Sequence, residues 1–259
     1  MSRLTLNTTK GMKKIKIAGL SADPPQGMTK ESVEDQTKKY VDRIGELHGI
    51  LQAEKKKSVL IVLQGMDGSG KDGAVDRVSK ECHPSSLNVT SFKKPTEEEF
   101  AHDFLWRVHK VAPARGAIQI FVRSHYEDVL IQRVHKWITE DRVDARFDAI
   151  NAFEKLLETD NHTLILKFFL HISYDQQELE LKERMDDPEK YWKHNSSDWK
   201  EREHWDEYMR CYEEVLNRSD IPWTVVPVNK RWYRDYVVAK TVAEAMEKLD
   251  LAYPALKED

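Results

Sequence analysis

The sequence predicts an α/β protein with a five-stranded, mainly parallel sheet and helices on both of its faces. Strand-like and helix-like stretches alternate along most of the chain, and such alternation implies parallel strands joined by right-handed crossovers. The first strand-like stretch, VLIVL at residues 59–63, is apolar throughout, which is typical of a strand buried on both faces. A glycine-rich turn follows this stretch directly and leads into a helical pattern, as a strand-to-helix crossover requires.

The other elements follow in order from the same periodicities. Strands are expected at residues 59–63, 88–92, 117–122, 163–170 and 223–228. Helices are expected at residues 30–53, from the glycine-rich turn to about 82, at 96–110, from the third strand to 137, at 147–159 and at 236–249. Thr96 and Glu99 form a capping box that opens the 96–110 helix, and we expect the HDFLW stretch around Trp106 to belong to the core.

The chain divides by composition into an arm and one domain. Residues 1–29 are polar, contain a Pro-Pro pair and are expected to form an extended N-terminal arm, whereas residues 30–259 are expected to form a single domain. Within that domain, residues 174–217 have no strand signal and are dense in charge and tryptophan. We expect this stretch to be a helical insertion between the fourth and fifth strands.

Bulk properties exclude several classes of function. The net charge of −4 and the pI near 6.2 argue against a nucleic-acid partner, although a local cluster of Lys and Arg can still bind a polyanion in a cleft. Cys82 and Cys211 are far apart and have no CxxC partner, which favours a reducing compartment. The N-terminus lacks the apolar region of a secretory signal, and no apolar run is long enough to span a membrane. We therefore expect a cytoplasmic protein with no membrane partner.

The strongest local signal is GMDGSGKDG at residues 65–73, which fits G-x-x-x-x-G-K between a strand and a helix. Glycines let the backbone curl so that its N–H groups face a phosphate, and the N-terminus of the following helix adds positive potential. Lys71 supplies a mobile cation for the neighbouring phosphates. The residues expected to bind phosphate with it are Gly65, Met66, Gly68, Ser69, Gly70, Asp72 and Gly73.

Two carboxylates make this loop unusual. Asp72 stands where Ser or Thr would normally ligate Mg²⁺, and it is either part of the site or a helix-start carboxylate favoured by the dipole. Asp67 lies inside the loop, where an anion beside phosphates is unfavourable unless a divalent cation bridges them. We therefore expect Asp67 to bind Mg²⁺ or to position a phosphate.

The end of the third strand carries a second motif, FVRSHYEDVLIQRVH at residues 121–135. In open α/β sheets the carboxyl ends of the strands line the ligand crevice, so Arg123 is expected beside the glycine loop, with Arg133 further along the next helix. The planar guanidinium of arginine suits phosphate.

With these motifs the chain resembles the polyphosphate kinase 2 family, most closely its third class. The matching segments are QGMDGSGKDG (64–73), FKKPTEEEFAHDFLWRVHK (92–110), RSHYEDVLIQRVH (123–135) and ERMDDPEKYWKHN (183–195). The resemblance implies a three-layer α/β/α P-loop kinase fold in which residues 174–217 act as a helical lid. It also implies transfer of a phosphoryl group between inorganic polyphosphate and AMP or ADP, with Mg²⁺ as the cofactor.

The resemblance further implies a role for individual residues. Asp67 would hold the metal and the acceptor phosphate, and Lys71 and Arg123 would contact phosphates at the reacting centre. The polyanion would be guided by Lys93, Lys94 and Arg133, with Arg184 and Lys190 reaching in from the lid. Phosphoryl transfer itself needs in-line positioning and charge neutralisation more than covalent chemistry, and Lys and Arg around a glycine loop supply both.

Val122 departs from the family pattern, which has Asp or Asn immediately before Arg-Ser. Valine can neither ligate Mg²⁺ nor donate a hydrogen bond to a phosphate. Three explanations stay open: the chain is a slowed enzyme, a neighbour such as Glu127 or Asp128 takes over the role, or the protein binds its ligands without useful turnover.

Two other functions remain alternatives to the polyphosphate-dependent kinase. One is an ATP-dependent nucleotide or small-molecule kinase on the same fold, and the other is a nucleotide- or polyphosphate-binding protein with little turnover. We also expect a homo-oligomer, for which the amphipathic helix near residues 37–53 is the candidate contact.

Overall fold

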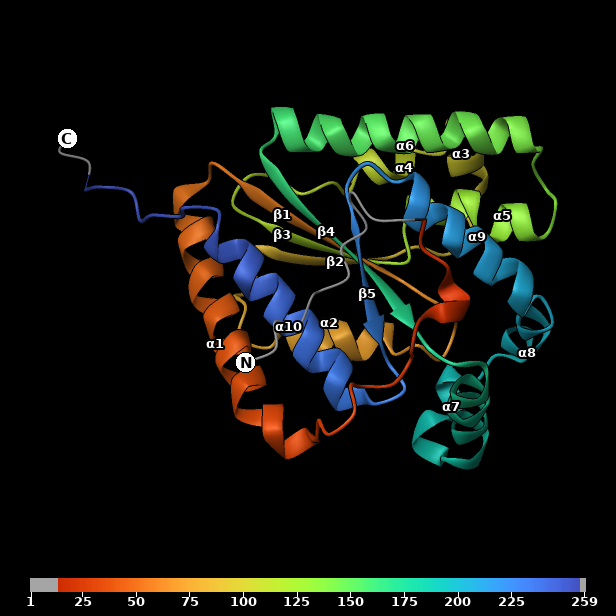
Figure 1. The fold of residues 1–259 in the computed structure, drawn as a ribbon. Coiled ribbons are helices and arrows are strands. Elements are labelled where there is room, and N and C mark those ends of the chain that lie inside the picture. The colour runs from red at the N-terminus through yellow and green to blue at the C-terminus, as the bar shows by residue number, and fades with distance from the viewer. Residues whose placement is uncertain (1–13, 257–259) are drawn as a thin grey trace.

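A computed structural model describes residues 14–256, which form one five-stranded sheet (Figure 1). The strand order is β2-β3-β1-β4-β5, and every neighbouring pair is parallel. The prediction of a mainly parallel five-stranded sheet is therefore confirmed. The strands are β1 (Ser58–Gln64), β2 (Leu87–Ser91), β3 (Ile118–Val122), β4 (Thr163–His171) and β5 (Trp223–Pro227).

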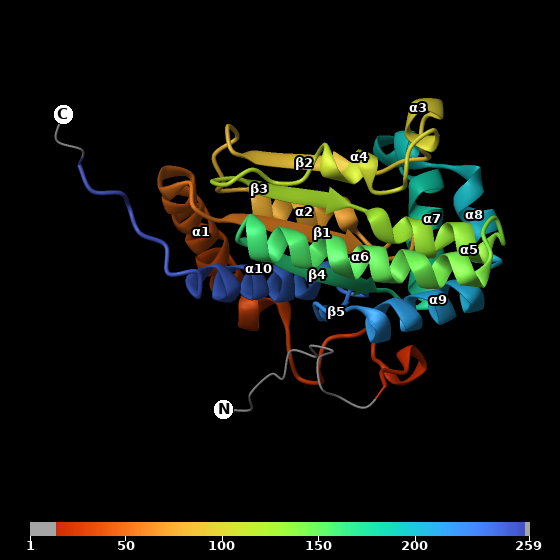
Figure 2. The same ribbon diagram turned by 90° about the horizontal axis from the view of Figure 1, so that it is seen from above.

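Helices cover both faces of the sheet and give the three layers that were expected (Figures 1 and 2). One face carries α1 (Lys30–Glu54), α2 (Lys71–Ser79) and α10 (Arg231–Glu247). The other face carries α4 (Trp106–His109), α6 (Glu140–Asp160) and α9 (Trp205–Arg218). β1 is buried along its whole length because both layers pack on it, which explains its uninterrupted apolar sequence.

Two of the expected helices are broken. Residues 96–110 form two single turns, α3 (Glu97–Phe100) and α4, instead of one helix, although the Thr96–Glu99 capping box is present. The side chain of Asp103 accepts a hydrogen bond from the backbone N–H of Leu105 (2.9 Å) and starts the second turn anew. After β3 the chain forms η2 (His125–Val129) and α5 (Ile131–Val134) rather than a continuous helix to residue 137.

The segment between β4 and β5 contains only helices among its regular elements. These are α7 (Tyr174–Asp186), η3 (Pro188–Lys193), α8 (Ser196–Arg202) and α9. Figure 1 shows that α7 and α8 project beyond the carboxyl end of the sheet, whereas α9 returns to pack on it. This segment therefore stands over the edge of the sheet at which the glycine loop and the end of β3 lie.

The described part of the arm, residues 14–29, contacts α9, the end of β4 and the loop after β5; residues 1–13 lie outside the described residues. The arm contains η1 (Ile17–Gly19), and the backbone N–H of Ile17 donates to Glu213 of α9 (3.0 Å). The apolar face of α1 packs against α10, so its amphipathic pattern is explained within one chain and no longer points to a subunit contact. Within residues 14–256, no helix is long and apolar enough to cross a membrane.

Candidate active site

The glycine loop joins β1 to α2 at the carboxyl end of the sheet. Gly70 caps the start of α2 with φ 80° and ψ 33°, a left-handed conformation that residues with a side chain rarely adopt. The chain thus turns directly from the end of β1 into the first turn of α2, where backbone N–H groups have no helical acceptor. This is the geometry in which a strand-to-helix loop binds an anion.

Lys71 folds back over the loop. Its Nζ donates to the carbonyl oxygens of Gly65 (2.8 Å) and Met66 (3.1 Å), and it lies 3.9 Å from Oδ1 of Asp67. Burial lowers the pKa of the Lys71 ammonium, against the opposing effect of the Asp67 charge. The lysine therefore lies at the centre of the loop, where its charge can meet a bound phosphate.

Arg123, which follows β3, forms an ion pair with Asp67 in the glycine loop. Nη2 of Arg123 lies 2.5 Å from Oδ1 of Asp67. Arg123 follows β3 directly and has φ 60°, so the chain turns sharply there and directs the guanidinium toward the loop. Burial raises the pKa of the Asp67 carboxyl, but the charges of Lys71 and Arg123 outweigh burial and hold that pKa below its ordinary value. Asp67 is therefore ionised at neutral pH.

A cleft of about 530 Å³, here called the basic cleft, opens between the glycine loop, the ends of β2 and β3, and the helical segment that follows β4. Its cationic side chains come from five separate stretches of the chain, which are the start of α2, the residues just after β2, the residue just after β3, the segment after β4 and the start of α10. They are Lys71, Lys93, Arg123, Arg184, Lys190, Lys193, Arg231 and Arg234. Its carboxylates are Asp67, Asp72, Asp76, Glu180, Glu183 and Asp198.

Ion pairs within the helical segment engage several of these cations. Arg184 pairs with Asp198 (2.8 Å), and Lys190 pairs with Glu183 (2.6 Å). Burial, followed by the nearby charge of Asp67, raises the pKa of the Asp198 carboxyl. Asp198 and Asp67 come from distant segments of the chain and both line the basic cleft, so the charge of Asp67 adds to the rise in the pKa of Asp198.

The segment is also tied directly to the loop and to α10. The side-chain amide of Gln177 in α7 donates to the backbone carbonyl of Asp67 (2.9 Å). Arg231 at the start of α10 pairs with Glu180 (2.7 Å) and Glu183 (2.6 Å) of α7. The helical segment that covers the basic cleft is therefore held by contacts to both the glycine loop and α10.

Most residues predicted for the site from the sequence meet at this cleft. From the glycine loop, the residues that line it are Asp67, Gly68, Gly70, Lys71, Asp72 and Gly73, whereas Gly65 and Met66 line an adjoining cavity of about 150 Å³ and Ser69 lines neither. Lys93, Arg123, Arg184 and Lys190 also line the basic cleft, and so does Val122, which is largely buried at the tip of β3. Lys94 is exposed beside Lys93 and is not part of the lining.

Glu127 and Arg133 lie outside the basic cleft. Glu127 lines an adjoining cavity of about 150 Å³, with Asp67 and Arg123 at its border, and accepts a hydrogen bond from Gln64 (2.9 Å). Arg133 forms ion pairs with Glu140 and Glu214, and it lines neither cavity.

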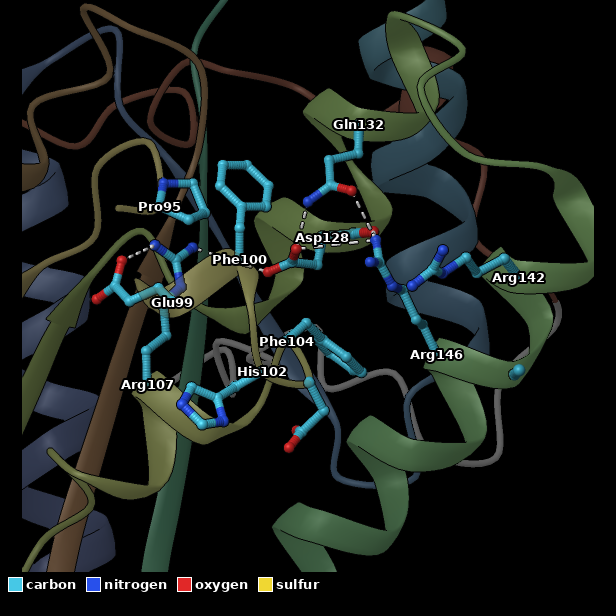
Figure 3. Close-up of a pocket in the computed structure, with 12 residues that line it drawn as sticks. Pro95, Glu99, Phe100, His102, Phe104, Arg107, Asp128, Gln132, Arg142 and Arg146 are labelled. Atoms are coloured by element: carbon cyan, nitrogen blue, oxygen red, sulfur yellow. Dashed lines mark hydrogen bonds and ion pairs between the residues drawn. The ribbon is translucent and has the colours of Figure 1, made fainter. Parts of the chain in front are cut away.

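A second cavity of about 280 Å³, here called the Asp128 cavity, lies between α3, α5 and α6 (Figure 3). Asp128 projects into it, and Arg107 and Arg146 flank the carboxylate at 3.8 Å. Oδ2 of Asp128 is buried and has no hydrogen-bond partner. Phe100 and Phe104 add apolar rings to the lining, and Phe100 is 60% exposed. The cavity therefore combines aromatic surface with a buried acceptor.

Sequence reasoning missed this cavity and several residues of the basic cleft. Charged helix positions usually indicate a solvated face, so the charged lining residues Glu180, Glu183, Lys193, Asp198, Arg231 and Arg234 were not predicted. Asn195, the N-cap of α8, was not predicted either. The last helix begins at Arg231, earlier than the expected residue 236, and its first turns supply two of these side chains. The HDFLW stretch was expected in the core; Leu105 is buried there, but His102 and Phe104 line the Asp128 cavity.

The parallel sheet, the glycine loop and the basic cleft together define an α/β protein of the kinase type. The chain belongs to the polyphosphate kinase 2 family, because the profile described as Polyphosphate kinase 2 (PPK2) matches residues 27–253. The resemblance and the fold class predicted from the sequence are thereby confirmed.

Two curated relatives and one crystal structure agree with this assignment. The chain is 45% identical over 215 residues to the AMP/ADP-polyphosphate phosphotransferase of Meiothermus ruber, covering 82% of this chain and 80% of that protein. It is 38% identical over 241 residues to the ADP-polyphosphate phosphotransferase of Rhodopseudomonas palustris, covering 87% and 83%. The crystal structure of polyphosphate kinase 2 from Arthrobacter aurescens TC1 matches with a TM-score of 0.90 at 40% identity, covering 95% of this chain and 89% of that one.

Proposed function

We propose that the protein transfers phosphoryl groups between inorganic polyphosphate and AMP or ADP, forming ADP and ATP with Mg²⁺. The observation that carries the proposal is the basic cleft, in which eight Lys and Arg side chains surround one glycine loop. A single phosphate needs only a few of these cations, whereas a chain of phosphates needs a row of them. The names of the relatives in Meiothermus ruber and Rhodopseudomonas palustris support the same substrates.

In this proposal the reacting phosphates lie over the glycine loop. Lys71 neutralises charge at the transferred group, and Arg123 lies where donor and acceptor phosphates meet. Lys93, Arg184 and Lys190 hold the rest of the polyphosphate in line, which is the main requirement of phosphoryl transfer. Residues 174–217 act as a lid whose closure excludes water from the transferred group.

The residues around the loop suit a Mg²⁺ ion. Mg²⁺ prefers oxygen ligands and is usually held by one or two carboxylates together with substrate phosphates. Asp67 is ionised and lines the basic cleft, and the side chains of Asn195 and Asp198 add oxygen donors to the same lining. Asp67 would hold the ion with the phosphates, and the ion would neutralise charge on the phosphate oxygens. Val122 contributes no ligand.

The Asp128 cavity is the proposed place of the nucleotide base. Adenine is planar and carries one amino group, so it can lie against Phe100 and Phe104 and donate to the unpartnered Oδ2 of Asp128. The cavity adjoins the basic cleft, because Arg107 in its wall donates to the backbone carbonyl of Lys93 (2.9 Å). Asp128→Asn should raise the KM for AMP and ADP and leave the KM for polyphosphate unchanged. Equal changes in both would argue against this placement.

The first test supplies Mg²⁺, long-chain polyphosphate and ADP or AMP to the purified protein without ATP, and follows the nucleotides by chromatography. ATP formed from ADP, and ADP formed from AMP, would support the proposal. Lys71→Ala and a reaction with excess chelator are the matched controls, and neither should form product. If the protein instead consumes ATP to phosphorylate another acceptor and never uses polyphosphate, the donor assignment is wrong and an ATP-dependent kinase remains.

A second candidate is a protein that binds nucleotide and polyphosphate with little turnover. Val122 favours it, because the tip of β3 beside Arg123 carries an apolar side chain at the reacting centre. Calorimetric binding of both ligands without product formation would support this candidate. A homo-oligomer and a cytoplasmic location stay predictions, and light scattering during size-exclusion chromatography measures the first of them.

A further inference from the structure

Arg234 is buried where α10 crosses the start of α2. Only 6% of its surface is exposed, and it lines the basic cleft. Its Nη1 donates to the backbone carbonyl of Gly70 (3.0 Å), while Nε and Nη2 donate to Oδ1 of Asp235 (2.9 and 2.7 Å). The guanidinium is thus fixed between its own helix and the glycine that begins α2.

This guanidinium fills the space where the side chains of two glycines would stand. A Cβ on Gly70 would lie 2.1 Å from Nη1 of Arg234, and a Cβ on Gly73 would lie 2.6 Å from Nη2. Gly70 has a positive φ that favours glycine in any case, but Gly73 lies inside α2 without one. The three atoms nearest to a Cβ at position 73 all belong to Arg234, so the arginine accounts for the glycine there.

The local charges favour a bound anion beside this arginine. Among the described residues, Asp235 is the carboxylate in ion-pair distance of Arg234, and it also pairs with Arg77 of α2 (3.2 Å). One carboxylate is therefore shared by two guanidinium groups next to the positive end of the α2 dipole. A buried cation in such a place is costly unless an anion binds nearby.

We propose that Arg234 is a positioning residue of the phosphate-binding loop, and that Gly73 is a glycine because it must leave room for this side chain. The Gly70 carbonyl accepts a hydrogen bond from the backbone N–H of Ala74 (3.1 Å), and Arg234 adds a second hydrogen bond to the same carbonyl. In this inference that second bond keeps the N–H groups of the first turn of α2 directed at the phosphate. The inference rests on the phosphate-binding role of the loop in the proposed function, but not on the identity of the donor.

Titration calorimetry with inorganic tripolyphosphate tests the inference directly. Arg234→Met should weaken binding about 10- to 100-fold, as expected for a lost hydrogen bond to a charged group that orders a site. Arg234→Lys should not restore binding, because an ammonium keeps the charge but cannot form the same fork of hydrogen bonds. The KM for polyphosphate should rise in both variants, whereas the KM for AMP should stay the same.

Gly73→Ala provides a second, milder variant, in which residue 234 is still an arginine. Its added methyl group should displace the guanidinium and weaken tripolyphosphate binding, and the double variant with Arg234→Met should bind no worse than Arg234→Met alone. Gly49→Ala is the matched control, since its Cβ would meet only the Tyr253 hydroxyl at 3.7 Å and it lies in α1. Binding by the Gly49→Ala protein should be unchanged.

Several outcomes would overturn the inference. It is wrong if Arg234→Lys binds tripolyphosphate as well as the wild type does, because a positive charge at position 234 would then be enough for binding. It is also wrong if the effects of Gly73→Ala and Arg234→Met add in the double variant. Lys71→Ala serves as the benchmark: if it loses binding while Arg234→Met does not, only this inference fails, and if neither loses binding, the proposed phosphate site fails as well. Melting temperatures of all variants separate unfolding from a local effect.

Discussion

Replacing Val122 by asparagine is expected to raise kcat for phosphoryl transfer by about 10²- to 10³-fold. Val122 ends β3, pairs in register with Leu63 and Ser91, and lines the basic cleft next to Arg123. An amide there can bind a cation through its oxygen or donate to a phosphate, and valine can do neither. A preorganised polar group at a reacting centre is worth about 2.7–4 kcal/mol, which gives the expected factor.

The same substitution should cost some stability. Val122 is 8% exposed, so the variant transfers an amide into a mostly buried position beside the sheet. Burial of a polar group that is incompletely hydrogen-bonded costs about 1–3 kcal/mol, and we expect the low end because the side chain borders the open cleft. Val122→Thr keeps the shape of valine and has only a short hydroxyl, so it should show a smaller gain in kcat.

The assay measures ATP formed from ADP at saturating polyphosphate, together with urea unfolding of each variant. A gain in kcat accompanied by a small loss of stability is the expected result. If Val122→Asn folds and its kcat lies within about twofold of the wild type, the reasoning is refuted. Activity in that case would rely on another side chain, for which Glu127 is the nearest candidate in sequence.

Three further predictions concern the loop, the Asp128 cavity and the core. Lys71→Ala should abolish phosphate binding in calorimetry, and unchanged nucleotide affinity would contradict the assignment of the glycine loop. Burial raises the pKa of Asp128 from 3.8 to about 6, so the wild type should lose about 2 kcal/mol of unfolding free energy relative to Asp128→Asn as the pH rises from 4 to 7; a pH-independent difference in urea unfolding would refute this. Lys167 and Glu154 form a fully buried ion pair (2.6 Å), so Lys167→Met should cost about 3–5 kcal/mol and Lys167→Met with Glu154→Gln much less. Equal losses of unfolding free energy in the single and the double variant, measured by thermal and urea unfolding, would contradict this prediction.

Local sequence patterns predicted the elements that depend on local interactions. The glycine loop and Lys71 were found because the spacing of the loop is itself the phosphate-binding geometry. The prediction of one helix at residues 96–110 was wrong, because α3 ends at Phe100 and the Asp103 side chain accepts the Leu105 N–H in a turn that periodicity does not reveal. The Asp128 cavity was missed because its walls come from residues 95–107, 128–132 and 142–146, which only the packing of α6 brings together.

Long charged side chains were the least predictable part of the site. Arg133 follows the second motif and was expected to guide the polyanion, but the short α5 turns it toward α6 and α9, where Glu140 and Glu214 pair with it. Arg234 shows the opposite case, since it resembles an ordinary helix-surface residue and yet contacts Gly70. Sequence spacing predicts the backbone position of such a residue. The group that its charged side chain pairs with depends on the tertiary fold.

Several cations of the basic cleft form ion pairs with the protein's own carboxylates in the described structure. Arg123 pairs with Asp67, Arg184 with Asp198, and both Lys190 and Arg231 with Glu183. A polyphosphate must therefore replace these carboxylates rather than fill a vacant row of charges, and each exchange returns only part of the energy of a new ion pair. Glu183 binds cations from both η3 and α10, and Glu180 of the same helix binds Arg231 as well, so displacement of these carboxylates would loosen the contacts of α7 with η3 and with α10 together. Binding of the polyanion and closure of the helical segment are thus expected to occur as one coupled step.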